Sequence, residues 1–181
     1  SRLFEGRGGG KFVDVSAKAG VLLDRPGRCC AWSDVDGDGW LDLFVACPNT
    51  PSVLFRNNRN GTFTGITKQA GVTLDKRMSL GCAFGDVDGD GRDDLFVANY
   101  NSQVSALFKN LGGGKFRDIT VVAGLTRKAA SVGCVFADTG NRGRLDLHVT
   151  TDSWLSGANY TEQQLLARGH TVEPVILYEN D

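Results

Sequence analysis

Nine residues that contain four aspartates constrain the fold of this chain more than any other stretch. The stretch fits the pattern D-x-D-x-D-G-x-x-D and occurs twice, with its acids at Asp34, Asp36, Asp38 and Asp42 and again at Asp86, Asp88, Asp90 and Asp94. Four carboxylates packed so closely repel one another unless a hard cation lies among them. Calcium suits the pattern best, because it accepts about six to eight oxygen ligands in a flexible geometry, whereas magnesium prefers a stricter octahedron and keeps more water.

The acidic stretch belongs to a longer internal repeat. Its first aspartate recurs at positions 34, 86 and 138, a period of 52 residues, which is close to the roughly 40–50 residues of a propeller blade. A second segment, a leucine followed by an aromatic residue, starts at Leu3, Leu54, Leu107 and Leu177. The recurrence of both segments predicts a fold built from copies of one unit.

Each period offers four short strands. In the second unit they are predicted at 80–85, 94–98, 105–109 and 115–119, where apolar, aromatic and β-branched residues dominate. The strand at 94–98 and its copy in the first unit are apolar on both faces, which favours a sheet buried between two neighbouring sheets. The predicted fold class is therefore all-β: consecutive four-stranded antiparallel blades of a β-propeller type, partial or open, with one short helix in an insertion.

The predicted units divide one repeat domain that runs from 1 to 181. A partial blade with its third and fourth strands occupies 1–25, complete blades occupy 26–77 and 78–130, and a second partial blade occupies 131–181 with an insertion at 151–173. In the insertion, Thr161 and Gln164 form a capping box and Gly169 is placed to end a helix. The insertion is expected at the end of its sheet that lies away from the acidic loops.

Charge and hydropathy argue against two classes of partner. The net charge of −1 offers no basic stripe for nucleic acid or anionic lipid. No apolar run approaches the roughly 20 residues of a membrane-spanning helix, and the first residues lack the pattern of a signal peptide. We therefore expect no nucleic-acid partner, no membrane insertion, and a mature product or an excised piece.

The five cysteines show no metal-binding spacing. Cys30, Cys82 and Cys134 each stand four residues before the first aspartate of a loop, so they are expected to be small, half-buried residues at equivalent points of the repeat. Cys29 and Cys47 lie outside this register. A disulfide between these two is compatible with the sequence but not established by it.

The motifs of the second unit resemble a known repeat. The residues 82–99, followed by 107–110 and 114–118, are similar to the FG-GAP/VCBS repeat, which builds the propeller of integrin α-subunits and of many bacterial surface proteins. The resemblance covers nearly the whole chain except about 151–173. It implies extracellular, calcium-bound blades that serve adhesion or scaffolding rather than catalysis.

The resemblance also implies two sets of calcium ligands. They are the side chains of Asp34, Asp36, Asp38 and Asp42 with the carbonyl of Trp40, and the side chains of Asp86, Asp88, Asp90 and Asp94 with the carbonyl of Arg92. The third loop keeps Asp138 and Asp146 but has Gly140 and Arg142 at two ligand positions. It is predicted to bind no calcium, with the Arg142 guanidinium in place of the ion.

Other interpretations of the acidic loops and of the chain are weaker. An EF-hand needs a glutamate at the twelfth loop position, where Val45 and Val97 stand. Solvated turns stabilised by aspartate side chains explain one such loop but fit two matching loops poorly. His148 takes the strand position of Phe44 and Phe96, which favours a packed histidine, and no arrangement of nucleophile and base is found in the sequence.

The favoured function is therefore a non-enzymatic, calcium-stabilised structural or adhesive module, located outside the cell or at its surface. Its partial blades leave strand edges unpaired, so head-to-tail association of two copies by strand completion is expected, with another surface protein or a glycan as the alternative partner. Two other functions remain open. One is a fragment of a larger ligand-binding propeller with contacts around Trp154 and Tyr160, and the other is a non-catalytic module of a polysaccharide-acting enzyme.

Overall fold

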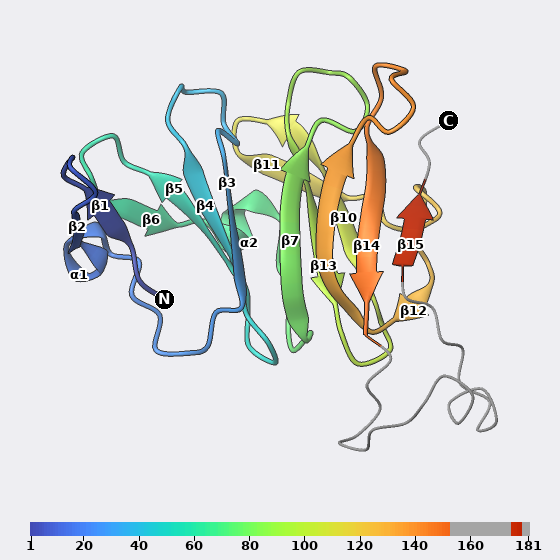
Figure 1. Cartoon of the computed structure of the whole chain (residues 1–181), viewed down its shortest axis with the longest axis horizontal. Coiled ribbons are helices and arrows are strands. Elements are labelled where there is room, and N and C mark those ends of the chain that lie inside the picture. Colours follow the sequence, from blue (N-terminus) through green and yellow to red (C-terminus); the bar gives the residue numbers. More distant parts are fainter. Residues whose placement is uncertain (153–174, 179–181) are drawn as a thin grey trace.

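Strands that are close in the sequence pair with one another throughout the fold. The computed structural model describes residues 1–152 and 175–178, and every strand pair in this part is antiparallel. Its elements, shown in Figure 1, are β1 (Phe4–Gly6), β2 (Phe12–Asp14), α1 (Ser16–Ala19), β3 (Cys29–Ser33), β4 (Asp42–Ala46), β5 (Val53–Asn57), β6 (Phe63–Gly65), α2 (Thr67–Ala70), β7 (Ser79–Gly85), β8 (Asp94–Asn99), β9 (Gln103–Val104), β10 (Ala106–Gly112), β11 (Lys115–Asp118), β12 (Lys128–Ala129), β13 (Ser131–Ala137), β14 (Asp146–Thr151) and β15 (Val175–Tyr178).

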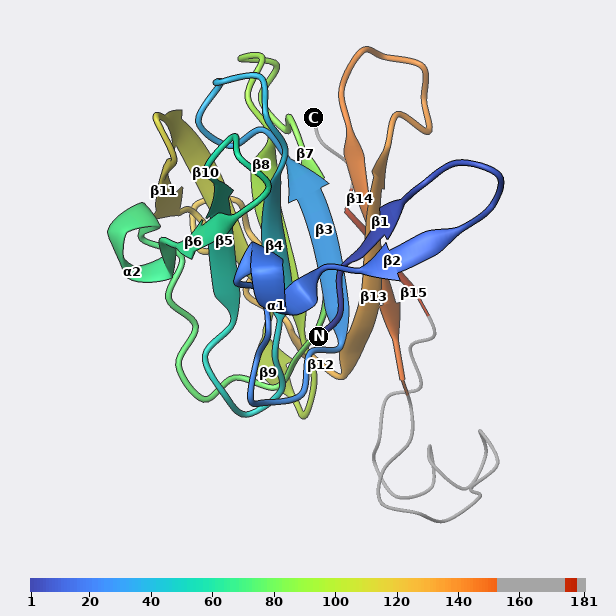
Figure 2. The same ribbon diagram turned by 90° about the vertical axis from the view of Figure 1, so that its left-hand side faces the viewer.

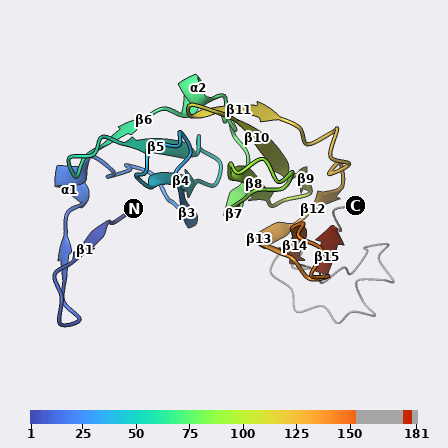
Figure 3. The same cartoon turned by 90° about the horizontal axis from the view of Figure 1, so that it is seen from above.

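Four sheets follow one another along the chain. The N-terminal hairpin is β1-β2, sheet 1 is β3-β4-β5-β6, sheet 2 is β7-β8-β10-β11, and the C-terminal sheet is β13-β14-β15, while β9 and β12 form a small additional pair. Seen from above in Figure 3, the sheets lie along an arc with β3, β7 and β13 on its inner side and β6 and β11 on its outer side. The prediction of an all-β, antiparallel fold is confirmed.

The second strand of each complete sheet is buried on both faces. In β4, Leu43 and Val45 pack into a cluster with Ala19 of α1 and Val21 just after it, whereas Phe44 packs into the cluster shared with sheet 2. In β8 the same alternation places Leu95 toward sheet 1 and Phe96 toward the C-terminal sheet. The apolar cores therefore lie on both faces of each second strand. This explains why each second strand is a continuous apolar run, since its alternate side chains pack against different neighbours.

Two short helices follow the fourth strand of a unit, and the sequence analysis missed them. The helices α1 and α2 have four residues each and end at Gly20 and Gly71, which adopt the left-handed conformation with φ of 74° and 82°. Glycine reaches this conformation without strain. A four-residue helix is too short to show helical periodicity, so only the recurring Ala-Gly pair signals it. The helix predicted within the insertion lies outside the described residues.

The hairpin β1-β2 is the least covered part of the described chain. Figure 2 shows its turn extending away from β3 and β4, and all residues of both strands are exposed. At the opposite end of the chain, β14 pairs with β15. Leu147 pairs with Tyr178, and Thr150 pairs with Val175 at the end of the sheet that lies away from the acidic loop. The position of the insertion itself is outside the described residues. No helix of the described part is long and apolar enough to cross a membrane.

A pair of phenylalanine substitutions tests the burial of the second strand. Phe96 is 1% exposed between sheet 2 and the C-terminal sheet, whereas Phe12 is 68% exposed. We expect Phe96→Ala to lower the free energy of unfolding by roughly 3–5 kcal/mol, because it removes a buried ring and leaves a cavity. Phe12→Ala, the matched control, should change it by less than about 0.5 kcal/mol. Urea unfolding measures both, and equal effects would contradict the described packing.

Candidate metal centre

Three loops leave the sheets at the same edge. In Figure 1 the connections β3–β4, β7–β8 and β13–β14 all project from the upper side. In the first, carboxylate oxygens of Asp34, Asp36 and Asp42 lie within 4.8 Å of one another, and those of Asp86, Asp88 and Asp94 do so in the second. The structure therefore brings together three of the four acids predicted for each site.

The first aspartate of each loop organises the backbone around it. Asp34 accepts hydrogen bonds from the backbone N–H groups of Gly37, Asp38 and Gly39 at 2.7–3.0 Å. Asp86 repeats the arrangement in the second loop at 2.8–3.1 Å. Gly37 and Gly39 take φ of 75° and 86°, values that other residues reach only with strain. These turns bend the loop around the carboxylate of the first aspartate.

The last aspartate of each loop is buried at the start of the second strand. The carboxylate of Asp42 accepts hydrogen bonds from the N–H groups of Val35 and Asn57, and that of Asp94 accepts the equivalent pair. Burial raises the pKa of both carboxyl groups, against the opposing effect of these hydrogen bonds. Each of these carboxylates therefore joins the loop to the third strand of its sheet.

Basic side chains lie against the second and third aspartates of each loop. The Arg56 Nε atom is 2.6 Å from Asp36 Oδ2, and the Arg59 guanidinium is 2.7 Å from Asp38. The hydrogen bond from Arg59 is the main reason that the pKa of Asp38 is held below its usual value. Asp38 thus has a cation of its own and is not one of the three close carboxylates of the first loop.

The second loop has equivalent basic partners. Lys109 contacts both Asp88 and Asp90, and Arg92 contacts Asp90. The sequence analysis missed the role of these cations, although one signal was present. Arg56 and Lys109 occupy the same position of the recurring Leu-Phe-basic-Asn segment.

Charge balance tests whether these loops fit a divalent cation. In each loop the four carboxylates of the pattern face two basic side chains, which leaves two negative charges among them, and the second loop has a further acid, Asp93, that bonds to Ser33. One buried oxygen, Oδ1 of Asp36, has no hydrogen-bond partner in the described part of the chain. Buried carboxylate oxygens normally have a partner. An excess of two negative charges with an unsatisfied buried acceptor fits a hard divalent cation such as calcium.

The remaining predicted ligands are the carbonyls of Trp40 and Arg92. Both residues lie between the third and fourth aspartates, and their N–H groups donate to Asp38 and Asp90. Their assignment as ligands stays a prediction.

The third loop has a different charge balance. Arg142 donates its backbone N–H to Asp138, and its guanidinium pairs with Asp146. The hydrogen bonds from Arg142 and Gly143 hold the pKa of Asp138 below its usual value. The guanidinium thus contacts Asp146, whereas Asp138 is contacted by the backbone N–H of Arg142, so the predicted position of the guanidinium between the two carboxylates is met at Asp146 and stays a prediction at Asp138. The absence of calcium from this loop stays a prediction.

Two hydrogen bonds tie the first loop to sheet 2. Asn110 Nδ2 donates to the carbonyl of Val35 at 3.1 Å, and the Ser33 hydroxyl donates to Asp93 at 2.7 Å. Asn110 is buried, and it also bonds to Asp93 and Gly112. The loop is therefore part of the contact between the two sheets. Sequence reasoning did not identify these bonds.

The cysteines are free thiols, and Cys29 and Cys47 are not bonded to each other. Cys47 lies in the cluster between sheet 1 and α1, whereas Cys29 packs on the cluster between sheets 1 and 2. Of the three cysteines in register, Cys82 is buried and Cys134 half-buried, but Cys30 is exposed. The expectation of burial therefore holds for two of the three.

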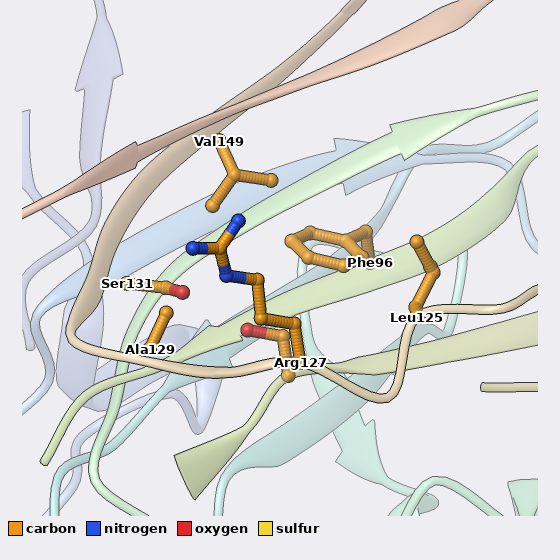
Figure 4. Close-up of a pocket in the computed structure, with 7 residues that line it drawn as sticks. Phe96, Leu125, Arg127, Ala129, Ser131 and Val149 are labelled. Carbon is orange, nitrogen blue, oxygen red and sulfur yellow. The ribbon is translucent and has the colours of Figure 1, made fainter. Parts of the chain in front are cut away.

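Hollows elsewhere in the described part offer less defined chemistry. One cavity of about 10 Å³ lies between sheet 2 and the C-terminal sheet, where Figure 4 shows the Arg127 side chain beside Phe96 and Val149. This volume holds about one water molecule at most. A wider, open hollow of about 390 Å³ is lined by residues that include Arg77, Asp118 and Val122. The acidic loops remain the best-defined candidate site.

Comparison with known proteins identifies the class of fold. A family model described as an FG-GAP-like repeat matches residues 34–97 and again 86–149. Each match begins at the first aspartate of an acidic loop and ends in the second strand of the following unit. The chain therefore belongs to the FG-GAP-like repeat family, as its motifs indicated.

Three similar proteins share one name, cartilage acidic protein 1. Over 108 residues, or 59% of this chain, the mouse protein is 33% identical, the human protein 32% and the Xenopus tropicalis protein 31%. The aligned part is 17%, 16% and 17% of those proteins, respectively. The chain thus spans about a sixth of the length of the curated relatives that it matches.

Two asparagines in equivalent positions test the link between loop and neighbouring sheet. The Asn57 side chain makes hydrogen bonds to Leu41 and Arg59 within its own sheet. The Asn110 side chain makes similar local hydrogen bonds and one more, to the carbonyl of Val35 in the first loop. We expect Asn110→Ala to lower the free energy of unfolding by about 1–3 kcal/mol more than Asn57→Ala, because buried groups lose their partners. Urea unfolding of both variants gives the difference, and equal losses would contradict a role for the bond between the sheets.

Proposed function

We propose that the chain is a non-enzymatic, extracellular structural module whose partial propeller is stabilised by two calcium ions. The observation that supports this most directly is the clustering of Asp34, Asp36 and Asp42 and its repetition 52 residues later. Two matching clusters at one edge of consecutive sheets are difficult to explain as solvated turns. Membership of the FG-GAP-like repeat family agrees with the proposal.

The side chains of each loop would hold the ion through carboxylate oxygens. Calcium, when bound, supplies two positive charges and a rigid link between these oxygens. Asp34 is fixed by three backbone N–H groups, and Asp42 is fixed by Val35 and Asn57. The acids are therefore oriented before an ion binds, which lowers the cost of ordering them.

The expected effect is structural, because the loop connects three strands of its sheet. Asp42 begins β4, its carboxylate bonds to Asn57 at the end of β5, and Asp34 follows β3 directly. Neutralising the carboxylates would relieve the repulsion among them and stabilise this end of the sheet. The loop end of the sheet would then be rigid and would not act as a conformational switch.

Calcium binding gives the first test. We expect two ions per chain, with dissociation constants in the range of about 0.1–1 mM that is typical of extracellular modules. At ten times the dissociation constant, each site should add about 1.4 kcal/mol to the free energy of unfolding. Isothermal titration calorimetry and thermal unfolding with and without a chelator measure the two quantities.

Single substitutions assign the sites. Asp36→Asn and Asp88→Asn should each reduce the stoichiometry to one ion, since neither side chain supports the loop backbone in the way that Asp34 and Asp86 do. Asp138→Asn, in the third loop, should leave the stoichiometry at two. An unchanged unfolding temperature after chelation would contradict the calcium proposal.

The proposed location is extracellular, where calcium is abundant enough to fill sites in this affinity range. The name of the relatives, cartilage acidic protein 1, refers to cartilage and agrees with this location.

We further propose that a second copy of the chain associates head to tail with the hairpin face, which we define by Phe4 and Phe12. The two rings lie on one side of the hairpin, because Gly6 pairs with Phe12 and is two residues from Phe4. They are 55% and 68% exposed. Exposed aromatic residues of this kind mark surfaces that bind a partner.

The repeat indicates what covers such a face. The copies of Phe4 are Phe55 and Phe108, and both are buried against the preceding sheet, with exposures of 6% and 2%. Phe116, a copy of Phe12, is buried in the same way. A sheet of the same class therefore fits the hairpin face, and a second copy supplies one at its C-terminal end.

Sedimentation velocity over a range of protein concentrations tests this association. We expect the wild-type chain to shift to a larger species as its concentration rises, and Phe4→Ser with Phe12→Ser to keep it monomeric. Val121→Ser with Val122→Ser, at exposed positions after β11, is the matched control and should associate like the wild type. A wild-type chain that stays monomeric at every concentration would contradict the proposal for this partner and leave the calcium proposal intact.

A further inference from the structure

The thiol of Cys29 faces sheet 2. Cys29 pairs with Ala46 in sheet 1, packs on the core between sheets 1 and 2, and is half-buried. Its Sγ atom lies 3.8 Å from the carbonyl oxygen of Cys82. Cys82 is a buried member of the same core cluster. Two thiols from adjacent sheets therefore meet in the contact between β3 and β7, which pack against each other.

Cys29 differs from its copies in the repeat of this chain. Its copies in the next two units are Gly81 and Gly133. A Cβ atom placed on Gly81 would lie 2.5 Å from the carbonyl oxygen of Val132, so β7 and β13 are too close for any side chain there. Between β3 and β7 there is room for a thiol. That thiol points at the cysteine of the next unit.

The other three cysteines are poorly placed to pair with Cys29. Cys47 lies in the core on the opposite side of sheet 1. Cys30 pairs with Val45, so its side chain is on the face of β3 opposite to that of Cys29. Cys134 packs on the core between sheet 2 and the C-terminal sheet. In the described part of the chain, Cys82 is thus the natural partner of Cys29.

We propose that Cys29 and Cys82 form a disulfide that links sheet 1 to sheet 2 in an oxidising environment. The oxidant is a small-molecule disulfide such as oxidised glutathione. The link would lie toward the end of β3 away from the acidic loop, whereas the bonds Ser33–Asp93 and Asn110–Val35 tie the two sheets at the loop end. Both ends of the contact would then be fixed.

The reaction proceeds by two exchanges that balance. The Cys29 thiolate attacks one sulfur of the small disulfide, which forms a mixed disulfide and expels the other sulfur as a thiolate that takes up a proton from water. The Cys82 sulfur then attacks the Cys29 sulfur, and the second small thiol leaves with the proton that Cys82 gives up. Two protein thiols are oxidised, and one small disulfide is reduced to two thiols.

The environment suits this order of events. The hydrogen bond from the Cys82 thiol lowers the pKa of Cys29 to about 6, so Cys29 is largely thiolate at neutral pH. The hydrogen bond to Cys29, together with burial, raises the pKa of Cys82. Cys29 is also the less buried of the two. The accessible thiolate therefore attacks first, and the buried thiol resolves the mixed disulfide.

Peptide mapping of the folded, calcium-loaded protein tests the proposal. Protein freed of reductant is incubated with oxidised glutathione, its remaining thiols are alkylated, and its tryptic peptides are identified without reduction. Because Cys29, Cys30 and Cys47 fall in one tryptic peptide, 29–56, a variant with both Cys30→Ser and Cys47→Ser is used beside the wild type. Both should yield the peptide of residue 29 joined to that of Cys82. The midpoint of thermal unfolding should rise by roughly 10 °C on oxidation and fall back with dithiothreitol.

Two further variants complete the design. Cys29→Ser should lose the link and the thermal shift, and Cys47→Ser should retain both. If Cys29→Ser does not fold, the protein with both Cys30→Ser and Cys47→Ser alone decides, since Cys29 is then the only cysteine of its peptide. A link from that peptide to Cys134, or alkylation of Cys29 after full oxidation, would overturn the proposal.

Discussion

The burial of each second strand on both faces is the constraint on which the structure depends. A sheet with β4 or β8 at its centre cannot be stable alone, because Phe44 and Leu43, or Phe96 and Leu95, need different neighbours. Sheets 1 and 2 therefore each contribute one side of two cores, and stability accumulates between sheets rather than within them. This explains why the chain repeats, and why a uniform pattern of leucine and phenylalanine in the second and third strands recurs from unit to unit.

The acidic loops concentrate negative charge, rather than apolar side chains, at one edge of the same sheets. The carboxylate that begins each second strand is buried, which raises its pKa, while the loop adds three further acids. Arg56 and Lys109 reduce the repulsion but do not cancel it. In the third loop Arg142 pairs with one of only two acids, and little excess charge remains. The number of acids per loop, compared with the number of nearby cations, thus separates the two candidate metal sites from the third loop.

Periodic features were predictable from the sequence, and contacts between units were not. The strands of sheet 2 were predicted to within a few residues, because alternation, turn glycines and the 52-residue period are all local or repetitive signals. The hydrogen bond from Asn110 to Val35 joins residues 75 positions apart, and the sequence near either residue does not indicate it. The direction of the Cys29 side chain likewise follows from strand pairing, which a pattern of residue types does not specify. The two four-residue helices were missed for a different reason, since they are shorter than the period that would reveal them.

The two ends of the array differ in chemistry, which bears on any contact between copies. The hairpin face keeps the aromatic residues of the repeat, but on the outer face of the C-terminal sheet His148 and Thr150 stand where sheets 1 and 2 have phenylalanine and alanine. Val135, beside His148, is 54% exposed. A head-to-tail contact would therefore bury less apolar surface than the contacts between sheets 1 and 2, and its polar groups would need partners. Such a contact should be weaker than the internal ones and reversible, which suits assembly that depends on concentration at a surface.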